Sequence, residues 1–208
     1  ILYSNFSKVV CVRDQTSFRS KPDQTISIIS PEEGTIITTS NLKYPLHEEK
    51  LRNMTFYIDD DYLIAALGDE EREVTFYTRS DKPHTEGNSY YKENNYWDIP
   101  QLVQESKVTL QKLDNLFEND SVFDIIKVDT QGSEIDILKG GKDLVSKAQA
   151  IILEVSFIPY NEGAPDSQET IEYMNEIGFE ERMSVGEHYD GDTIVQKDLL
   201  FTNKELVR

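Results

Sequence analysis

The clearest pattern of hydrophobic and polar positions lies in the nineteen-residue stretch FDIIKVDTQGSEIDILKGG, from Phe123 to Gly141. Its first six residues are mostly apolar and rich in β-branched side chains, which predicts a buried strand. The letters DTQG that follow predict a tight turn. Ser133 can then cap a helix on which Ile135 and Leu138 share one face, and the final glycine pair ends that helix.

A second apolar run, Ala150–Val155, is suited to a strand that is buried on both faces. From residue 105 onward strands and helices alternate, and the chain ends in two successive strands. We therefore expect Phe123–Val128 and Ile151–Val155 to be adjacent parallel strands in the middle of one sheet. The last connection is too short for a parallel crossover, so the final two strands should be antiparallel.

Other segments predict further elements of the same α/β fold. Thr109 can cap a helix over LQKLDNLF, and Asp166 to Glu169 has the spacing of a capping box. A compact apolar run, Tyr62–Leu67, is closed by the letters GDEE. Strands are predicted at Val9–Val12, Thr35–Thr39, Val74–Tyr77, Ser106–Leu110, Phe179–Val185 and Lys197–Thr202.

Carboxylates stand at the ends of the predicted central strands. Asp129 follows the first strand, Glu134 opens the helix after it, and Glu154 lies near the end of the second strand. Ligands of parallel α/β sheets bind outside the carboxyl ends of the strands, so these three residues are candidates for a reactive site. The alternative is that Asp129 only caps a turn and that Glu134 only favours the helix N-terminus through its dipole.

Composition and charge narrow the class of protein. A chain of 208 residues suits one domain, and it contains no apolar run as long as a membrane span. A net charge of −18 disfavours nucleic acid and anionic membranes as partners. The single cysteine and three scattered histidines match no disulfide and no metal-ligand spacing, which fits a cytoplasmic protein without a bound metal.

Several segments together resemble the FkbM-type family of methyltransferases that depend on S-adenosylmethionine. These are KVDTQGSEIDILKGG, IILEVSFIPYNEGAP and QKDLLFTNK, preceded in the same order by ALGDEEREVTFY and GNSYYKEN. The resemblance runs from about residue 54 to residue 204 of a chain that we expect to form one domain over residues 1–208. It implies a Rossmann-like, mostly parallel sheet with an antiparallel C-terminal strand.

The resemblance also implies transfer of the methyl group of S-adenosylmethionine to a hydroxyl of a small molecule or glycan. Such a reaction needs an aligned acceptor oxygen and a group that takes its proton. Asp129, Glu134 and Glu154 are then the candidates for catalysis. The candidates for cofactor binding are Asp14, Ala66, Leu67 and Asp129.

The polar and aromatic stretch between Thr78 and Pro100 is long for a connection, which predicts a functional loop. We expect its Thr85–Trp97 part to form a lid over the acceptor. Its candidate contacts with the acceptor are Asn88, Ser89, Tyr90 and Tyr91. The alternative is a surface loop whose rings cover an edge of the core.

The first 50 residues depart from the family pattern, because no glycine follows Asp14 before Gly34, where a glycine-rich loop is expected. This leaves open a diverged loop that still binds, a sequence altered across its first 50 residues, or cofactor binding completed by another chain. It also leaves open a methyltransferase-like binding or partner subunit without activity. A weaker alternative takes Asp129, Glu134 and Glu154 as Mg²⁺ or Ca²⁺ ligands of a hydrolase.

Overall fold

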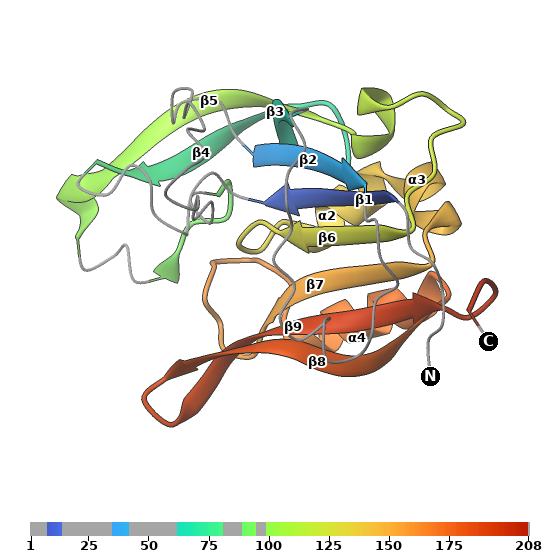
Figure 1. Cartoon of the computed structure of the whole chain (residues 1–208). Coiled ribbons are helices and arrows are strands. Elements are labelled where there is room, and N and C mark those ends of the chain that lie inside the picture. The colour runs from blue at the N-terminus through green and yellow to red at the C-terminus, as the bar shows by residue number, and fades with distance from the viewer. Residues whose placement is uncertain (1–7, 14–34, 42–61, 81–88, 95–98, 208) are drawn as a thin grey trace, which may run out of the picture.

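The computed structural model describes residues 8–13, 35–41, 62–80, 89–94 and 99–207, which build one twisted sheet with helices against it (Figure 1). The strands are β1 Lys8–Arg13, β2 Thr35–Asn41, β3 Tyr62–Leu67, β4 Glu73–Arg79, β5 Val103–Gln111, β6 Ile125–Asp129, β7 Ala150–Ser156, β8 Phe179–Asp190 and β9 Thr193–Asn203. The helices are α2 Glu134–Gly140, α3 Lys142–Lys147 and α4 Ser167–Glu176, with 3₁₀ turns η2 Pro100–Leu102 and η3 Leu113–Leu116.

The sheet has the strand order β4-β5-β3-β2-β1-β6-β7-β9-β8. Its described pairings are parallel for β1–β6, β3–β5 and β6–β7, and antiparallel for β1–β2, β2–β3, β4–β5, β7–β9 and β8–β9. The prediction of a mostly parallel sheet is therefore wrong at the level of pairings. The reason is that β2 is antiparallel to both of its neighbours. The outermost strands, β4 and β8, are also antiparallel to the strands beside them. The antiparallel C-terminal strand is confirmed in β9.

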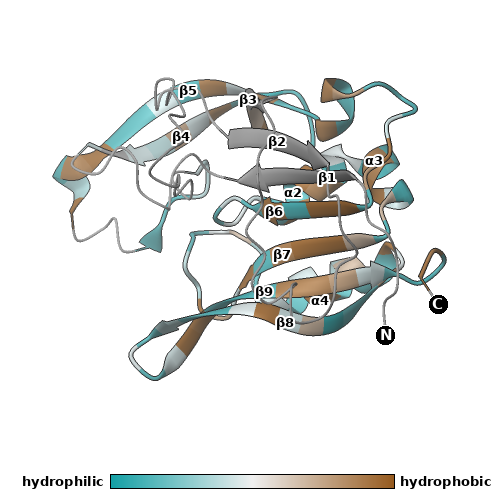
Figure 2. Cartoon of the chain, viewed as in Figure 1, coloured by the Kyte–Doolittle hydropathy of each residue, from teal (hydrophilic) through white to brown (hydrophobic). Residues whose placement is uncertain are grey.

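The predicted centre of the sheet is confirmed, since β6 pairs in parallel with β7 and neither is an edge strand. Both strands are buried along nearly their whole length, and Figure 2 shows hydrophobic residues gathered in them. Alternate residues of β6 and β7 pack with α2, α3 and α4 in one core cluster. The other residues of these strands point to the opposite face, and that face carries the polar site described below.

The predicted helix LQKLDNLF is wrong over its first half. Leu110 continues β5, where it pairs in parallel with Ala66 and is completely buried. Pairing with β3 thus wins over the helical spacing of the leucines. Only the short turn η3 remains, and its Asp114 carboxylate accepts hydrogen bonds from the backbone N–H groups of Asp143 and Leu144 at 3.1 Å each.

The three predicted helix caps have different outcomes. The cap by Thr109 is wrong, because Thr109 lies inside β5. The capping box is confirmed at α4, where Asp166 accepts from the N–H of Glu169 at 2.9 Å and Glu169 accepts from the N–H of Asp166 at 3.0 Å. The side-chain cap by Ser133 is wrong. Its hydroxyl donates backward to the carbonyl and hydroxyl oxygens of Thr130 at 3.3 and 2.9 Å, because the preceding turn folds over it.

Close packing between α2 and the end of β3 depends on a glycine. A Cβ built at Gly140 would overlap the carbonyl oxygen of Gly68, which belongs to the backbone and cannot turn aside. The end of α2 therefore lies directly against the segment that follows β3.

We predict that Gly140→Ala lowers the free energy of unfolding by about 3 kcal/mol or more, because overpacking against backbone forces the two segments apart. Urea unfolding measures it. The matched control is Gly191→Ala at the β8–β9 turn, where the new Cβ meets nothing within 4 Å and only the positive φ of 60° opposes it. That control should cost about 1–2 kcal/mol. Equal losses in both variants would contradict the close-packing argument.

Candidate active site

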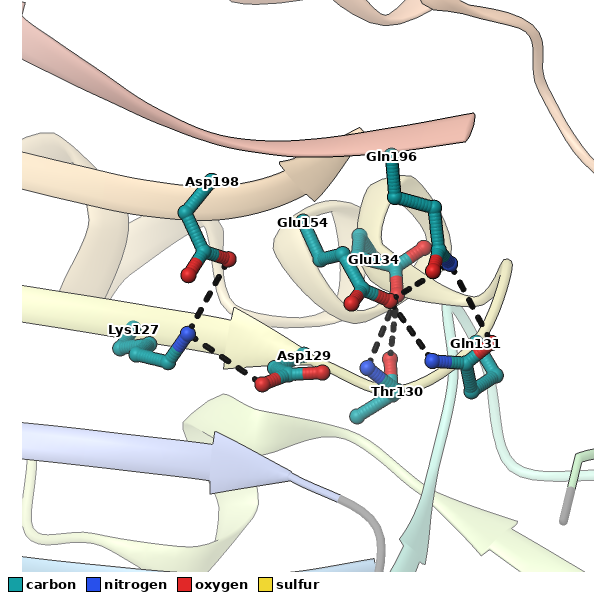
Figure 3. A network of polar contacts seen from close by, with 8 residues as sticks. All are labelled: Lys127, Asp129, Thr130, Gln131, Glu134, Glu154, Gln196 and Asp198. Atoms are coloured by element: carbon teal, nitrogen blue, oxygen red, sulfur yellow. Dashed lines mark hydrogen bonds and ion pairs between the residues drawn. The ribbon is translucent and has the colours of Figure 1, made fainter. Parts of the chain in front are cut away.

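A row of charged side chains crosses three neighbouring strands at the end of the sheet where β6 and β7 finish (Figure 3). Lys127 alternates along β6 with core residues, so it lies with Asp129 on the face of the sheet opposite α2, α3 and α4. Its Nζ lies 3.2 Å from Asp129 Oδ2 and 3.2 Å from Asp198 Oδ1. Asp198 of β9 is in register with Glu154 of β7. One ammonium thus lies among three carboxylates.

The carboxylates of Asp129, Glu154 and Asp198 each place an oxygen within 4.8 Å of the other two. Glu134 is not in this group, so the trio of the hydrolase alternative is not assembled. The ammonium of Lys127 offsets part of the negative charge of this group. Since one positive charge faces three acidic side chains, the site keeps an excess of negative charge that favours a cationic ligand.

Glu134 fastens the turn between β6 and α2. Its carboxylate accepts from the backbone N–H of Thr130 at 2.8 Å and from that of Gly132 at 3.0 Å, and the side chain is buried. Burial raises the pKa of Glu134 from 4.5 to about 7, although the backbone N–H donors act in the opposite direction. The residue therefore holds the backbone in place, and its predicted part in catalysis stays a prediction.

The turn itself adopts a backbone shape that most residues avoid. Gln131 has a φ of 56° and Gly132 a φ of 99°. A Cβ at Gly132 would also lie 2.9 Å from the Cβ of Ala164 in the loop after β7. The turn is thus both left-handed and tightly covered, which explains the glycine.

Residues 89–94, called the strap here, are the described part of the predicted lid. Ser89 pairs with Tyr77 of β4, and Glu93 pairs with Asn161 in the loop after β7. Tyr90 and Tyr91 both donate their hydroxyls to Asp136 Oδ2 of α2, at 2.9 and 2.7 Å. The strap is therefore tied to a strand, a helix and a loop at once.

The pKa values of both tyrosines reflect these contacts. Burial raises the pKa of Tyr90 and of Tyr91, and the Asp136 carboxylate raises them further. Both phenols thus stay protonated and act as donors to Asp136 near neutral pH.

Residues from three segments singled out in the sequence line one small hollow. It is lined by Ala66 and Leu67 of β3, Phe76 of β4, Ser89 and Tyr90 of the strap, and Thr130 and Ser133 of the turn. The strand end proposed for the cofactor and the segment proposed for the acceptor therefore meet beside Thr130, the residue that follows Asp129.

Comparison with protein families decides the class of this chain. The model of the FkbM methyltransferase domain matches residues 17–181. The chain belongs to the FkbM methyltransferase family. No curated protein and no solved structure matches it. Within the described residues, no helix combines the length and the apolar character needed to cross a membrane.

Membership of this family indicates methyltransferase activity in general. The predicted site residues of the FkbM domain are brought together in part. Asp129 and Glu154 lie in one charged row, and Ala66, Leu67, Ser89 and Tyr90 line one hollow. Tyr91 lies beside Tyr90 in the strap, with ring centroids 4.8 Å apart. The predictions for Asp14 and Asn88 fall outside the residues that the structure describes.

The sequence did not single out several residues that hold the site together. Lys127 stands two positions before Asp129, a spacing that places both on one face of a strand, and this signal could have found it. Asp198 and Gln196 share a face of β9 in the same way. Their approach to β7 depends on a strand register that the sequence does not show.

We predict that the free energy of unfolding of the wild-type domain decreases as the pH rises from 4.5 to 7, when it is compared with that of the Glu134→Gln variant at each pH. The folded pKa of Glu134 is about 7, above its usual 4.5, so the folded state binds this proton more tightly. The associated stability is full below pH 4.5 and is lost as the pH rises to 7, by about 3 kcal/mol. Urea unfolding at several pH values measures it. The control is Glu172→Gln on the exposed side of α4, and equal pH slopes in wild type and Glu134→Gln would contradict the prediction.

We predict that Tyr90→Phe and Tyr91→Phe each lower the free energy of unfolding by about 1–2 kcal/mol, because each removes a hydrogen bond to a partly buried carboxylate. The matched control is Tyr189→Phe, whose hydroxyl bonds Glu187 at 2.6 Å on an exposed hairpin. That change should have an effect below about 0.5 kcal/mol. If all three variants unfold alike, Asp136 does not fasten the strap.

Proposed function

We propose that this FkbM domain is an S-adenosylmethionine-dependent O-methyltransferase that acts on a hydroxyl of a small molecule or glycan. The observation that supports it is the acidic row of Asp129 and Glu154, which lies at the ends of the central parallel strands of a chain in this family. The parallel trio β1, β6 and β7, flanked by antiparallel β9, supports a Rossmann-like sheet and one domain over the whole chain.

The described residues fit the charge of the proposed cofactor. S-adenosylmethionine carries a sulfonium and an ammonium group, and the acidic row has an excess of negative charge beside an uncharged hollow. The apolar residues Ala66 and Leu67 line that hollow. Thr130 and Ser133 line it as well, and their hydroxyls hydrogen-bond each other. The residues in which a glycine-rich loop is expected lie outside the described part.

When bound, S-adenosylmethionine supplies an electrophilic methyl group. The residues of the domain have to orient the acceptor hydroxyl, take its proton and exclude water. Asp129 is fixed by Lys127 at 3.2 Å, so it offers a stable negative charge for a cationic group. Glu154 is the more suitable proton acceptor, because burial and the neighbouring Asp129 raise its pKa well above the usual value. Glu134 supports Asp129 and Glu154 indirectly, because its carboxylate holds the turn between β6 and α2.

The second candidate function is a methyltransferase-like binding or partner subunit without activity. Internal contacts favour it, since Asp129 is paired with Lys127 and both strap hydroxyls are bound to Asp136. A ligand would have to share or displace these contacts. The experiment below separates the two functions.

We predict that the domain binds S-adenosylmethionine and S-adenosylhomocysteine in isothermal titration calorimetry. Asp129→Asn keeps the shape of the side chain but removes its charge, so affinity for the cationic S-adenosylmethionine should fall about tenfold. Affinity for S-adenosylhomocysteine, whose sulfur is uncharged, should fall less. With an acceptor, methyl transfer by Asp129→Asn should fall by an order of magnitude or more.

The matched control is Asp190→Asn in the exposed β8–β9 turn, which should leave both affinities unchanged. Absence of binding by the wild-type domain would favour the partner subunit. Equal losses for both ligands would place Asp129 outside the reach of the sulfonium.

A further inference from the structure

Glu154 is held by two glutamine amides on one and the same oxygen. Gln131 of the turn donates its Nε2–H to Glu154 Oε2 at 2.7 Å, and Gln196 of β9 donates to the same oxygen at 2.9 Å. Glu154 as a whole is only 9% exposed. Figure 3 shows that the three side chains converge from three separate segments of the chain.

A third contact fixes which way the amides point. Gln196 Nε2 also donates to Gln131 Oε1 at 3.4 Å. If the amide of Gln131 were turned over, its N–H groups would face those of Gln196 and its carbonyl oxygen would face the carboxylate. Both contacts would become repulsive, so the ring of three side chains has one favourable arrangement. In it, both amides donate to Glu154.

The backbone supports the same arrangement. Gln131 adopts a φ of 56°, which a residue with a side chain rarely does, and this conformation brings its amide to β7. Backbone strain of this kind persists where the surrounding structure compels it. Here the Glu134 carboxylate, bound to the N–H groups on either side of Gln131, supplies that constraint.

The two oxygens of Glu154 are therefore not equivalent. Oε2 faces two N–H groups, so a proton on it would point at other protons. Oε1 has no hydrogen bond within the described residues and is the oxygen that can carry a proton. Burial raises the pKa of Glu154, and the negative charges of Asp129, Glu134 and Asp198 raise it further. Lys127 offsets this only in part, so Glu154 readily accepts a proton.

We propose that Gln131 and Gln196 are positioning residues that hold Oε2 of Glu154 and leave Oε1 to take the proton of the acceptor hydroxyl. This inference rests on the proposed methyltransferase function. As the hydroxyl oxygen forms its bond to the methyl group, the bond between that methyl group and sulfur breaks, the O–H bond breaks, and the proton moves to Oε1. Glu154 changes from carboxylate to neutral acid while the positive sulfonium becomes a neutral thioether, so atoms and charge balance.

The first test uses the unaltered chain of 208 residues without any ligand. In a pH titration followed by NMR, the side-chain amide signals of Gln131 and Gln196 should move together, because both report the charge of Glu154. In Glu154→Gln this shared transition should vanish. Gln149 serves as an internal control, since its Nε2 donates to Asp124 Oδ1 at 2.7 Å, and its signals should not follow the transition.

The second test removes each donor while keeping the length of the side chain. In Gln131→Met and Gln196→Met the ionised form of Glu154 loses one hydrogen bond, so its proton affinity should rise about tenfold in each. Infrared spectroscopy of the protonated carboxyl group, identified by its loss in Glu154→Gln, measures this affinity. Gln149→Met should leave it unchanged, and a general loss of packing would not raise it selectively.

Two outcomes overturn the proposal. One is that the amide signals of Gln131 and Gln196 do not change when Glu154 titrates. The other is that the proton affinity of Glu154 is unchanged in both methionine variants, provided that they fold. If one variant does not fold, the other variant and the wild-type titration still decide. Calorimetry with S-adenosylhomocysteine reports separately on the proposed function. A domain that passes the amide tests but binds no S-adenosylhomocysteine keeps the positioning role and loses the methyltransferase proposal.

Discussion

The site depends on the hydrogen bonds between the Glu134 carboxylate and the backbone of the preceding turn. The carboxylate binds the N–H groups of Thr130 and Gly132 and so closes the turn around Gln131. Without those hydrogen bonds, nothing would offset the strain of the left-handed conformation at Gln131, and the amide of Gln131 would not reach β7. A side chain that looks like a catalytic acid in the sequence thus acts first on the shape of the chain.

The same turn also connects the two halves of the polar site. On one side it follows Asp129, which Lys127 holds together with Asp198 of β9. On the other it lies against Ala164 in the loop after β7, and the neighbouring Asn161 binds the carbonyl oxygen of Tyr91 at 3.0 Å. Charge pairing and close packing therefore position the strap and the acidic row relative to one another.

The sequence predicted what depends on local pattern. Unbroken apolar runs identified β6 and β7, and the spacing of Asp166 and Glu169 identified the start of α4. Of the three carboxylates singled out in the sequence, Asp129 and Glu154 lie in one group, and Glu134 does not belong to it. What it missed depends on contacts between distant segments. Leu110 joined a strand because β3 lies beside it, and β2 reversed the pairing of the sheet. Gln196 and Asp198 joined the site only through the register of β9 with β7.

The position of β9 gives the site an unequal support. Among the described strands, β9 pairs on its outer side with β8, which ends the sheet. Gly186 of β8 leaves room for Asp198, since a Cβ there would lie 2.8 Å from Asp198 Oδ2. Strands near a free border open more often by local fluctuation than central strands do. Each such opening would release Gln196 and Asp198 together while Asp129 and Gln131 stayed in place. Local opening of the β8–β9 hairpin would then change how many amides and charges surround Glu154. A residue far from the centre of the sheet could thus change the proton affinity of the site.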